Sequence, residues 1–177
     1  MKRLRYIIPI AVFVLLVVLL GAGLHIDPRT VPSPFIGKPA PHLDLPSLDS
    51  PDQRMTPAKL LGRPWVLNVF ASWCATCGME AQQISELSQH IVTIGLNKED
   101  EAADARRWLQ QHGNPYAMIL VDKDGKTSID WGVYAVPETF IMDKKGIVRY
   151  KVIGVVTESE LRNTIIPLIK QLNAEPA

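Results

Sequence analysis

The chain has 177 residues and a formal net charge of +1, with 19 Lys and Arg residues against 18 Asp and Glu residues. So balanced a charge gives no strong signal of nucleic-acid binding. The length allows one domain with its own hydrophobic core beside a separate N-terminal segment.

The N-terminus combines a positive cluster with a long uncharged stretch. Lys2, Arg3 and Arg5 precede the stretch Tyr6–Leu24, which contains no charged residue. About 20 apolar residues span a bilayer as an α-helix, and a positive flank marks its cytoplasmic side. We therefore expect residues 1–24 to form a cytoplasmic tip and a single-pass signal-anchor in a membrane, with the rest of the chain outside the cytoplasm.

A cleavable signal peptide is the alternative, because the small residues at 21–23 resemble a cleavage site. The apolar stretch exceeds the usual h-region of about 7–15 residues, which favours the anchor. Three prolines within residues 25–34 predict an extended spacer, and residues 35–177 follow as the soluble domain. In either case the cysteines work outside the cytoplasm, where disulfides persist.

Beyond the spacer, the hydrophobic pattern predicts alternating strands and helices. In chain order we expect a hairpin or irregular cover over 38–50, a strand over 65–70, a helix after Cys74, a strand over 91–96, a helix over 101–112, a strand over 117–121, strands over 139–142 and 147–152, and a helix from Thr157. This order predicts an α/β fold with a mixed central sheet flanked by helices.

Two of these predicted elements stand directly before and after the cysteines. The strand over 65–70 is apolar on both faces except at Asn68, which is typical of a central strand. The helix after Cys74 is expected to turn four apolar residues inward at helical spacing, namely Met79, Ile84, Leu87 and Ile91.

Cys74 and Cys77 are the only cysteines, and they directly follow the predicted strand. At the start of a helix both sulfurs would lie on one face, close enough to form a disulfide. Unpaired N–H groups at a helix N-terminus favour the thiolate form. Such a thiolate attacks a disulfide, and the neighbouring thiol then resolves the mixed disulfide. We expect Cys74 to be the nucleophile and Cys77 the resolving thiol.

Two other interpretations of the cysteines stay open. Zinc takes four ligands in structural sites, but the chain has no second pair of cysteines, and its four histidines show no ligand spacing. A purely structural disulfide is the second alternative. A bridge that closes so short a loop constrains the unfolded chain little, which favours the redox interpretation.

Three stretches of the chain together resemble the DsbE/CcmG family, namely residues 73–77, 113–116 and 132–140. Members of that family are membrane-anchored, thioredoxin-like thiol:disulfide interchange proteins of cytochrome c maturation. The resemblance therefore implies an anchor in the inner (cytoplasmic) membrane and, over residues 35–177, a thioredoxin-like domain that faces the periplasm. The resemblance implies a cis Pro137 facing the disulfide, and no cofactor or metal. It also implies that the protein reduces disulfides of apocytochrome c or of its thiol-handling partner, with electrons from a transmembrane donor.

Two positions depart from the pattern of the family. The residue directly after the second cysteine is usually basic, but here it is Gly78. The usual Asn-Tyr-Lys-Asp stretch is replaced by Asn97–Asp100, which lacks the tyrosine. These departures bear on the reduction potential and on the fit of a partner, and not on the fold.

The proton donors and acceptors of the site form a second set of predictions. Asn68 occupies the strand position where thioredoxin has a buried acid, and an amide can neither take up nor release a proton. Glu80 matches an acidic position of the family, and Glu138 follows Pro137 directly. We expect one of the two glutamates to exchange a proton with Cys77. A solvated residue in the first helical turn is the alternative for Glu80.

The remaining predictions concern the partner. Trp73, Val136 and Pro137 are expected to bind it, because a cis bond before the proline would let the preceding backbone pair with an incoming chain; an ordinary turn at Pro137 is the alternative. Two other functions stay open, a peptide-binding module with little turnover and a copper carrier. Copper carriers of this kind pair cysteines with a nearby histidine, and in the sequence no histidine stands near the cysteines or Pro137.

Overall fold

The computed structural model describes residues 4–23 and 34–176, and the chain divides into two compact units. The first unit contains helix α1 (Leu4–Gly23), with Pro9 inside it. Within the described residues, no helix combines the length and apolarity that a membrane span requires. The spacer expected over 25–34 lies outside the described residues, apart from its last residue.

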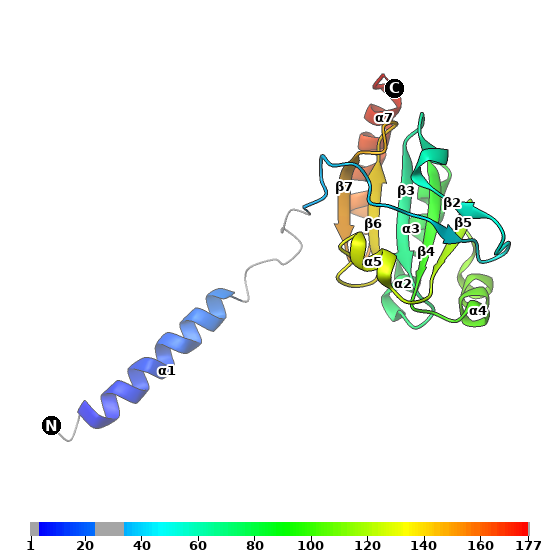
Figure 1. Ribbon diagram of the computed structural model, residues 1–177. Coiled ribbons are helices and arrows are strands. Elements are labelled where there is room, and N and C mark those ends of the chain that lie inside the picture. Colours follow the sequence, from blue (N-terminus) through cyan, green and yellow to red (C-terminus); the bar gives the residue numbers. More distant parts are fainter. Residues whose placement is uncertain (1–3, 24–33, 177) are drawn as a thin grey trace. The chain divides into compact units, whose positions relative to one another are not determined.

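The second unit is built on a five-stranded mixed sheet with the strand order β5-β4-β3-β6-β7 (Figure 1). The strands are β3 (Trp65–Phe70), β4 (Val92–Lys98), β5 (Met118–Asp122), β6 (Glu138–Met142) and β7 (Val148–Ile153). Strands β3, β4 and β5 are parallel, whereas β6 and β7 run antiparallel to their neighbours. The predicted mixed sheet is therefore confirmed.

A small hairpin and several helices surround the sheet. The hairpin joins β1 (Leu45–Pro46) to β2 (Arg54–Met55), and a 3₁₀ turn, η2 (Pro57–Leu60), follows it. The helices are α2 (Ala75–Met79), α3 (Ala81–Ser88), α4 (Ala102–His112), α5 (Lys126–Asp130), α6 (Glu158–Glu160), the π-helical η3 (Leu161–Ile165) and α7 (Ile166–Ala174). The helices over 101–112 and from Thr157 were predicted, but α5 was not.

The prediction for the helix after Cys74 is wrong in one respect. The segment forms two helices that meet at Glu80, and the side chain of Met79 is 69% exposed. Ile84 and Leu87 are buried as predicted, whereas Ile91 is buried beyond the end of α3. The turn between the helices brings Glu80 inward, and this places Met79 on the outside.

The two faces of the sheet are covered by different parts of the chain. On β3, Leu67 and Val69 pack with Trp131, which follows α5, and with the segment before β3. Alternate residues of a strand point to opposite faces, so Val66 and Asn68 lie on the other face. Val66 packs there with residues of α3 and α7. Asn68 is therefore buried beneath the helices that follow the cysteines.

Candidate active site

Cys74 and Cys77 form a disulfide at the N-terminus of α2, with their Cα atoms 5.4 Å apart. Cys74 is the N-cap residue of this helix, and its Sγ accepts the backbone N–H of Cys77 at 3.1 Å. The hydroxyl of Thr76 lies 3.4 Å from the same sulfur. Cys74 is 5% exposed and Cys77 1%. The N–H at the helix N-terminus that would stabilise a thiolate is therefore hydrogen-bonded to Sγ of Cys74, the more accessible of the two sulfurs.

The loop before Cys74 is held by the end of β4. The carboxylate of Asp100 accepts the backbone N–H and the hydroxyl of Ser72 at 2.6 and 2.7 Å, and it also accepts the amide of Asn97 at 2.8 Å. Burial raises the pKa of Asp100, but these hydrogen bonds outweigh it and hold the pKa below its usual value. Trp73 is 57% exposed, and its indole N–H donates to the carbonyl of Glu99. The stretch that departs from the family pattern thus anchors the loop that carries the cysteines.

The peptide bond between Val136 and Pro137 is cis, as the resemblance implied. Val136 packs against the cluster that contains both cysteines, and the carbonyl of Pro137 accepts the N–H of Gly154 at 2.9 Å. Within residues 34–176, no group hydrogen-bonds the backbone N–H or carbonyl of Val136. The backbone N–H and carbonyl of Val136 are therefore available to hydrogen-bond another chain near the disulfide.

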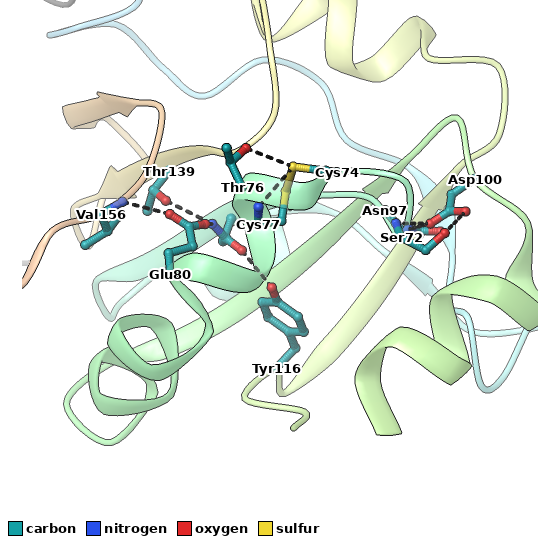
Figure 2. The surroundings of a disulfide bond; sticks show 11 residues. Ser72, Cys74, Thr76, Cys77, Glu80, Asn97, Asp100, Tyr116, Thr139 and Val156 are labelled. Carbon is teal, nitrogen blue, oxygen red and sulfur yellow. Dashed lines mark hydrogen bonds between the residues drawn. A yellow bond between two sulfur atoms is a disulfide. The ribbon is translucent and has the colours of Figure 1, made fainter. Parts of the chain in front are cut away.

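Glu80 lies one helical turn after Cys77, and its side chain belongs to a buried polar network (Figure 2). One carboxylate oxygen accepts the amide of Asn68 at 2.9 Å, and the other accepts the backbone N–H of Val156 at 2.8 Å. Burial raises the pKa of Glu80 to about 7, although these two hydrogen bonds lower it. The residue is 1% exposed, so the alternative of a solvated helix residue is wrong.

Asn68 connects Glu80 to two hydroxyl groups. Its amide N–H₂ also donates to Thr139 at 3.0 Å, and its carbonyl oxygen accepts the hydroxyl of Tyr116 at 2.7 Å. Burial and the charge of Glu80 raise the pKa of Tyr116 well above its usual value. A Cβ atom at Gly95 would lie 2.9 Å from the Tyr116 ring, so this close approach requires glycine. Tyr116 stood in a family motif, but no role was predicted for it.

Glu138 lies on the opposite face of the sheet from this network. It is paired with Val69 in the register of β3 and β6, one position from the pair Asn68 and Thr139. Its carboxylate forms an ion pair with Lys151 of β7 at 2.8 Å. The two glutamates proposed as proton sites are thus not brought together, and only Glu80 lies on the face of the sheet that α2 and α3 cover.

The histidines differ from the expectation in one respect. A Cβ atom at Gly78 would lie 2.9 Å from Nε2 of His112, so this imidazole stands directly beside the residue that follows Cys77. The ring stacks on Trp108, which packs in the same cluster as the cysteines. Among the described residues, no three His, Cys, Asp or Glu side chains converge as metal ligands do.

Comparison with known proteins gives consistent results. The model of the AhpC/TSA family matches residues 36–151. The thiol:disulfide interchange protein DsbE of Pseudomonas aeruginosa is 42% identical and covers 99% of this chain and 98% of its own. The protein of that name in Escherichia coli K12 is 40% identical, with 100% of both chains covered. A DsbE structure from Chlorobium tepidum has a TM-score of 0.65 at 21% identity over 77% of this chain and 97% of its own, which shows the thioredoxin-like fold alone.

Proposed function

The chain belongs to the DsbE family of thiol:disulfide interchange proteins, and we propose that it reduces disulfides of apocytochrome c or of its thiol-handling partner during cytochrome c maturation. The activity itself is that of a thiol:disulfide oxidoreductase. The observation that carries this function is the disulfide at the N-terminus of α2, where the N–H of Cys77 meets the sulfur of Cys74.

The reaction runs from the reduced form of the protein. The Cys74 thiolate attacks one sulfur of the target disulfide, so an S–S bond forms between the two chains, the S–S bond of the target breaks, and its other sulfur leaves as a thiolate. The Cys77 thiol then loses its proton and attacks Cys74. The second target thiolate leaves, and the protein ends with its own disulfide. Two electrons pass to the target, and a donor must return them for the next cycle.

Glu80 is the group proposed to take the proton of Cys77. With its pKa raised to about 7, its carboxyl group can both accept and release a proton near neutral pH. Asn68 can follow this change by turning its amide over, because a protonated Glu80 needs an acceptor where the carboxylate needed a donor. The other partners of that amide are the hydroxyls of Tyr116 and Thr139, which both donate and accept.

The partner polypeptide is proposed to dock at Trp73, Val136 and Pro137. The backbone N–H and carbonyl of Val136 have no hydrogen-bond partner within residues 34–176. They can therefore hydrogen-bond an extended chain, as strands do at a sheet edge. The exposed ring of Trp73 offers apolar contact area beside the disulfide. A transmembrane protein that donates electrons is the proposed reductant, since the reaction consumes two electrons in each cycle.

We also propose that residues 1–24 anchor the chain in the inner membrane, with residues 35–177 in the periplasm. The support is the uncharged stretch that follows Lys2, Arg3 and Arg5. After cell fractionation, the full-length protein should stay in the membrane pellet at alkaline pH, and a maleimide reagent that cannot cross the membrane should label Cys74 in intact spheroplasts. A soluble periplasmic protein that begins near residue 24 would contradict the anchor.

Trapping of a mixed disulfide tests the activity and the substrate together. Reduced Cys77→Ser protein is mixed with an oxidised peptide that contains Cys-x-x-Cys-His, the haem-attachment motif of c-type cytochromes. We expect a covalent adduct through Cys74, visible by mass spectrometry and released by dithiothreitol. Cys74→Ser is the matched control and should form no adduct under the same conditions. Adduct formation mainly by the Cys74→Ser variant would reverse the roles of the two cysteines.

A further inference from the structure

One ion pair of the described residues is completely buried. Nζ of Lys151 lies 2.8 Å from the carboxylate of Glu138, and the two side chains are 1% and 0% exposed. In each other ion pair of the described residues, at least one side chain is 29% or more exposed. A buried ion pair adds little to stability on average, because taking two charges out of water offsets their attraction. The presence of this pair therefore calls for another reason.

Both members of the pair bind the backbone of the loop between α5 and β6. Nζ of Lys151 donates to the carbonyl of Gly132 at 2.8 Å, and the carboxylate of Glu138 accepts the N–H of Tyr134 at 3.1 Å. Gly132 has φ +62°, and a Cβ atom there would lie 2.7 Å from the ring of Phe35. The pair thus holds two points of the loop from inside, just before the cis bond of Pro137.

The same lysine also supports an exposed aromatic ring. Nζ of Lys151 lies 4.9 Å from the ring centres of Tyr134 and of Phe140. Phe140 is completely buried, whereas Tyr134 is 73% exposed. A cation attracts the face of an aromatic ring, so the buried charge restrains a tyrosine that projects toward solvent three residues before Pro137.

We propose that Lys151 and Glu138 are positioning residues, which hold residues 132–137 in the conformation that receives the partner polypeptide beside the disulfide. In this role Glu138 handles no proton. The pair instead fixes the backbone around Tyr134 and the segment that leads into Val136. The inference rests on the proposed function, because it assigns the loop to binding of the substrate chain.

The test removes both charges together. Removing one partner would leave a buried, uncompensated charge and destabilise the fold, whereas removing both avoids that penalty. The double variant Lys151→Met/Glu138→Gln is therefore compared with the wild type in the full-length protein. The substrates are the oxidised Cys-x-x-Cys-His peptide and glutathione disulfide. Glutathione disulfide is too small to extend along residues 132–137 as a polypeptide would. Lys144→Met, a lysine change at the other end of β6, is the matched control.

We expect the double variant to unfold near the temperature of the wild type, while its KM for the peptide rises about tenfold with little change in kcat. The ratio of peptide to glutathione rates should fall by the same factor, and Lys144→Met should leave that ratio unchanged. A folded double variant with the KM of the wild type would overturn the positioning role, because a purely structural pair predicts that result.

Hydrogen exchange separates failure of this inference from failure of the proposed function. If the wild type reduces glutathione disulfide but not the peptide, the proposed substrate is wrong. The effect of the ion pair on the loop can then still be measured by hydrogen exchange. Amides within residues 132–137 should exchange about tenfold faster in the double variant than in the wild type, while those of β3 stay protected. Equal exchange in the loop would overturn the positioning role without reference to any substrate.

Discussion

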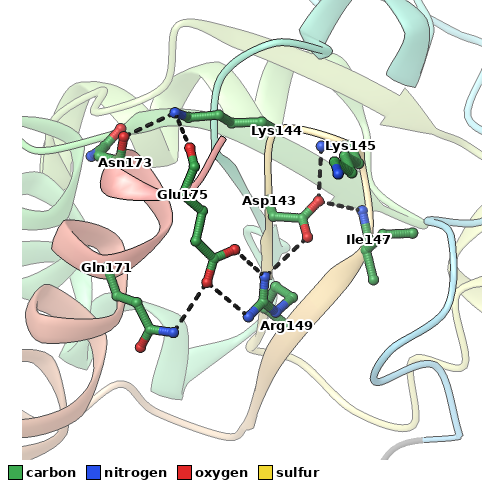
Figure 3. Close-up of polar contacts among 8 residues, drawn as sticks. All are labelled: Asp143, Lys144, Lys145, Ile147, Arg149, Gln171, Asn173 and Glu175. Atoms are coloured by element: carbon green, nitrogen blue, oxygen red, sulfur yellow. Dashed lines mark hydrogen bonds and ion pairs between the residues drawn. The ribbon is translucent and has the colours of Figure 1, made fainter. Parts of the chain in front are cut away.

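Two carboxyl groups at opposite ends of the central sheet, those of Glu80 and Glu175, are held in opposite ways. At the end beside the cysteines, Glu80 is 1% exposed, and its partners, the amide of Asn68 and the N–H of Val156, are neutral. At the other end, the partly exposed carboxylate of Glu175 binds the guanidinium of Arg149 at 2.6 and 3.1 Å (Figure 3). Glu80 accepts two hydrogen bonds and Glu175 accepts three, so the charge of the donors differs more than their number.

The difference appears in the two pKa values. Burial raises the pKa of Glu80 to about 7 in spite of its hydrogen bonds. The hydrogen bonds from Arg149 and Gln171 hold the pKa of Glu175 below its usual value. The two neutral donors of Glu80 therefore do not offset the burial of its carboxylate, whereas the charged donor of Glu175 near the surface favours the ionised form. The redox end keeps a group that can exchange protons, and the other end attaches the C-terminal helix.

Removing the titratable group from the redox end tests this comparison most severely. In Glu80→Gln the side chain keeps its size but can no longer take up a proton. We expect the attack of Cys77 on the mixed disulfide to slow about a hundredfold near pH 7, measured by rapid-quench release of the reduced peptide. Glu175→Gln is the matched control and should leave this rate unchanged. Equal slowing in both variants would show that the rate does not depend on the Glu80 proton.

The same variant should change the pH dependence of stability. Glu80 binds its proton more tightly in the folded chain, with a pKa of about 7, than in the unfolded chain, where the pKa is about 4.3. The contribution of Glu80 is therefore complete at low pH and is lost as the pH rises through 7, by on the order of 3 kcal/mol. Urea unfolding of the oxidised protein at pH 5 and pH 8 should show this loss in the wild type and not in Glu80→Gln.

Glu175 predicts the opposite slope at lower pH. Its pKa is lowered in the folded chain, so its contribution is present at neutral pH and is lost on acidification through the folded pKa. Glu175→Gln should remove part of the acid limb of the stability curve and leave the change between pH 5 and pH 8 intact. If Glu175→Gln instead removed the loss of stability between pH 5 and pH 8, that loss would come from Glu175 and not from Glu80.

A methyl group at Gly95 should disturb the redox end without changing any polar group. It would lie 2.9 Å from the ring of Tyr116 and 3.0 Å from that of Phe70, and these rings stack on each other. We expect Gly95→Ala to lower the free energy of unfolding by about 1–3 kcal/mol, because neither ring has room to withdraw. Tyr116→Phe removes only the hydroxyl on Asn68 and separates the two causes. Thermal unfolding of both variants measures the effects, and an undiminished stability of Gly95→Ala would show that the rings can move.

The smallest effect is expected at the C-terminal end. Arg149 contacts both Asp143 and Glu175, but all three side chains are partly exposed, and exposed ion pairs are weak and screened by salt. Arg149→Met should cause a small loss of stability at low ionic strength that disappears as sodium chloride is added. A loss that persists at high salt would show that packing of the arginine stem, and not its charge, supports the helix.

Local patterns were enough to predict much of the fold. The run over 65–70 is apolar, and its prediction as a central strand is confirmed because a strand covered on both faces needs apolar side chains on both. The inward residues of α4, Ala105, Trp108 and Leu109, follow from helical spacing. Helix α5 has no such pattern. The carboxylate of Asp122 at the end of β5 binds the N–H groups of Thr127 and Ser128, which begin this helix.

By itself, the sequence determined most of the elements, their order and the cysteine pair, since each of these depends on residues that are close together in the chain. Only the tertiary structure decided the roles of the glutamates. The partners of Glu80 stand 12 and 76 residues away, and the strand register places Glu138 on the opposite face with Lys151. Burial and hydrogen bonding between distant segments set the pKa of a carboxyl group, and no local pattern carries that information.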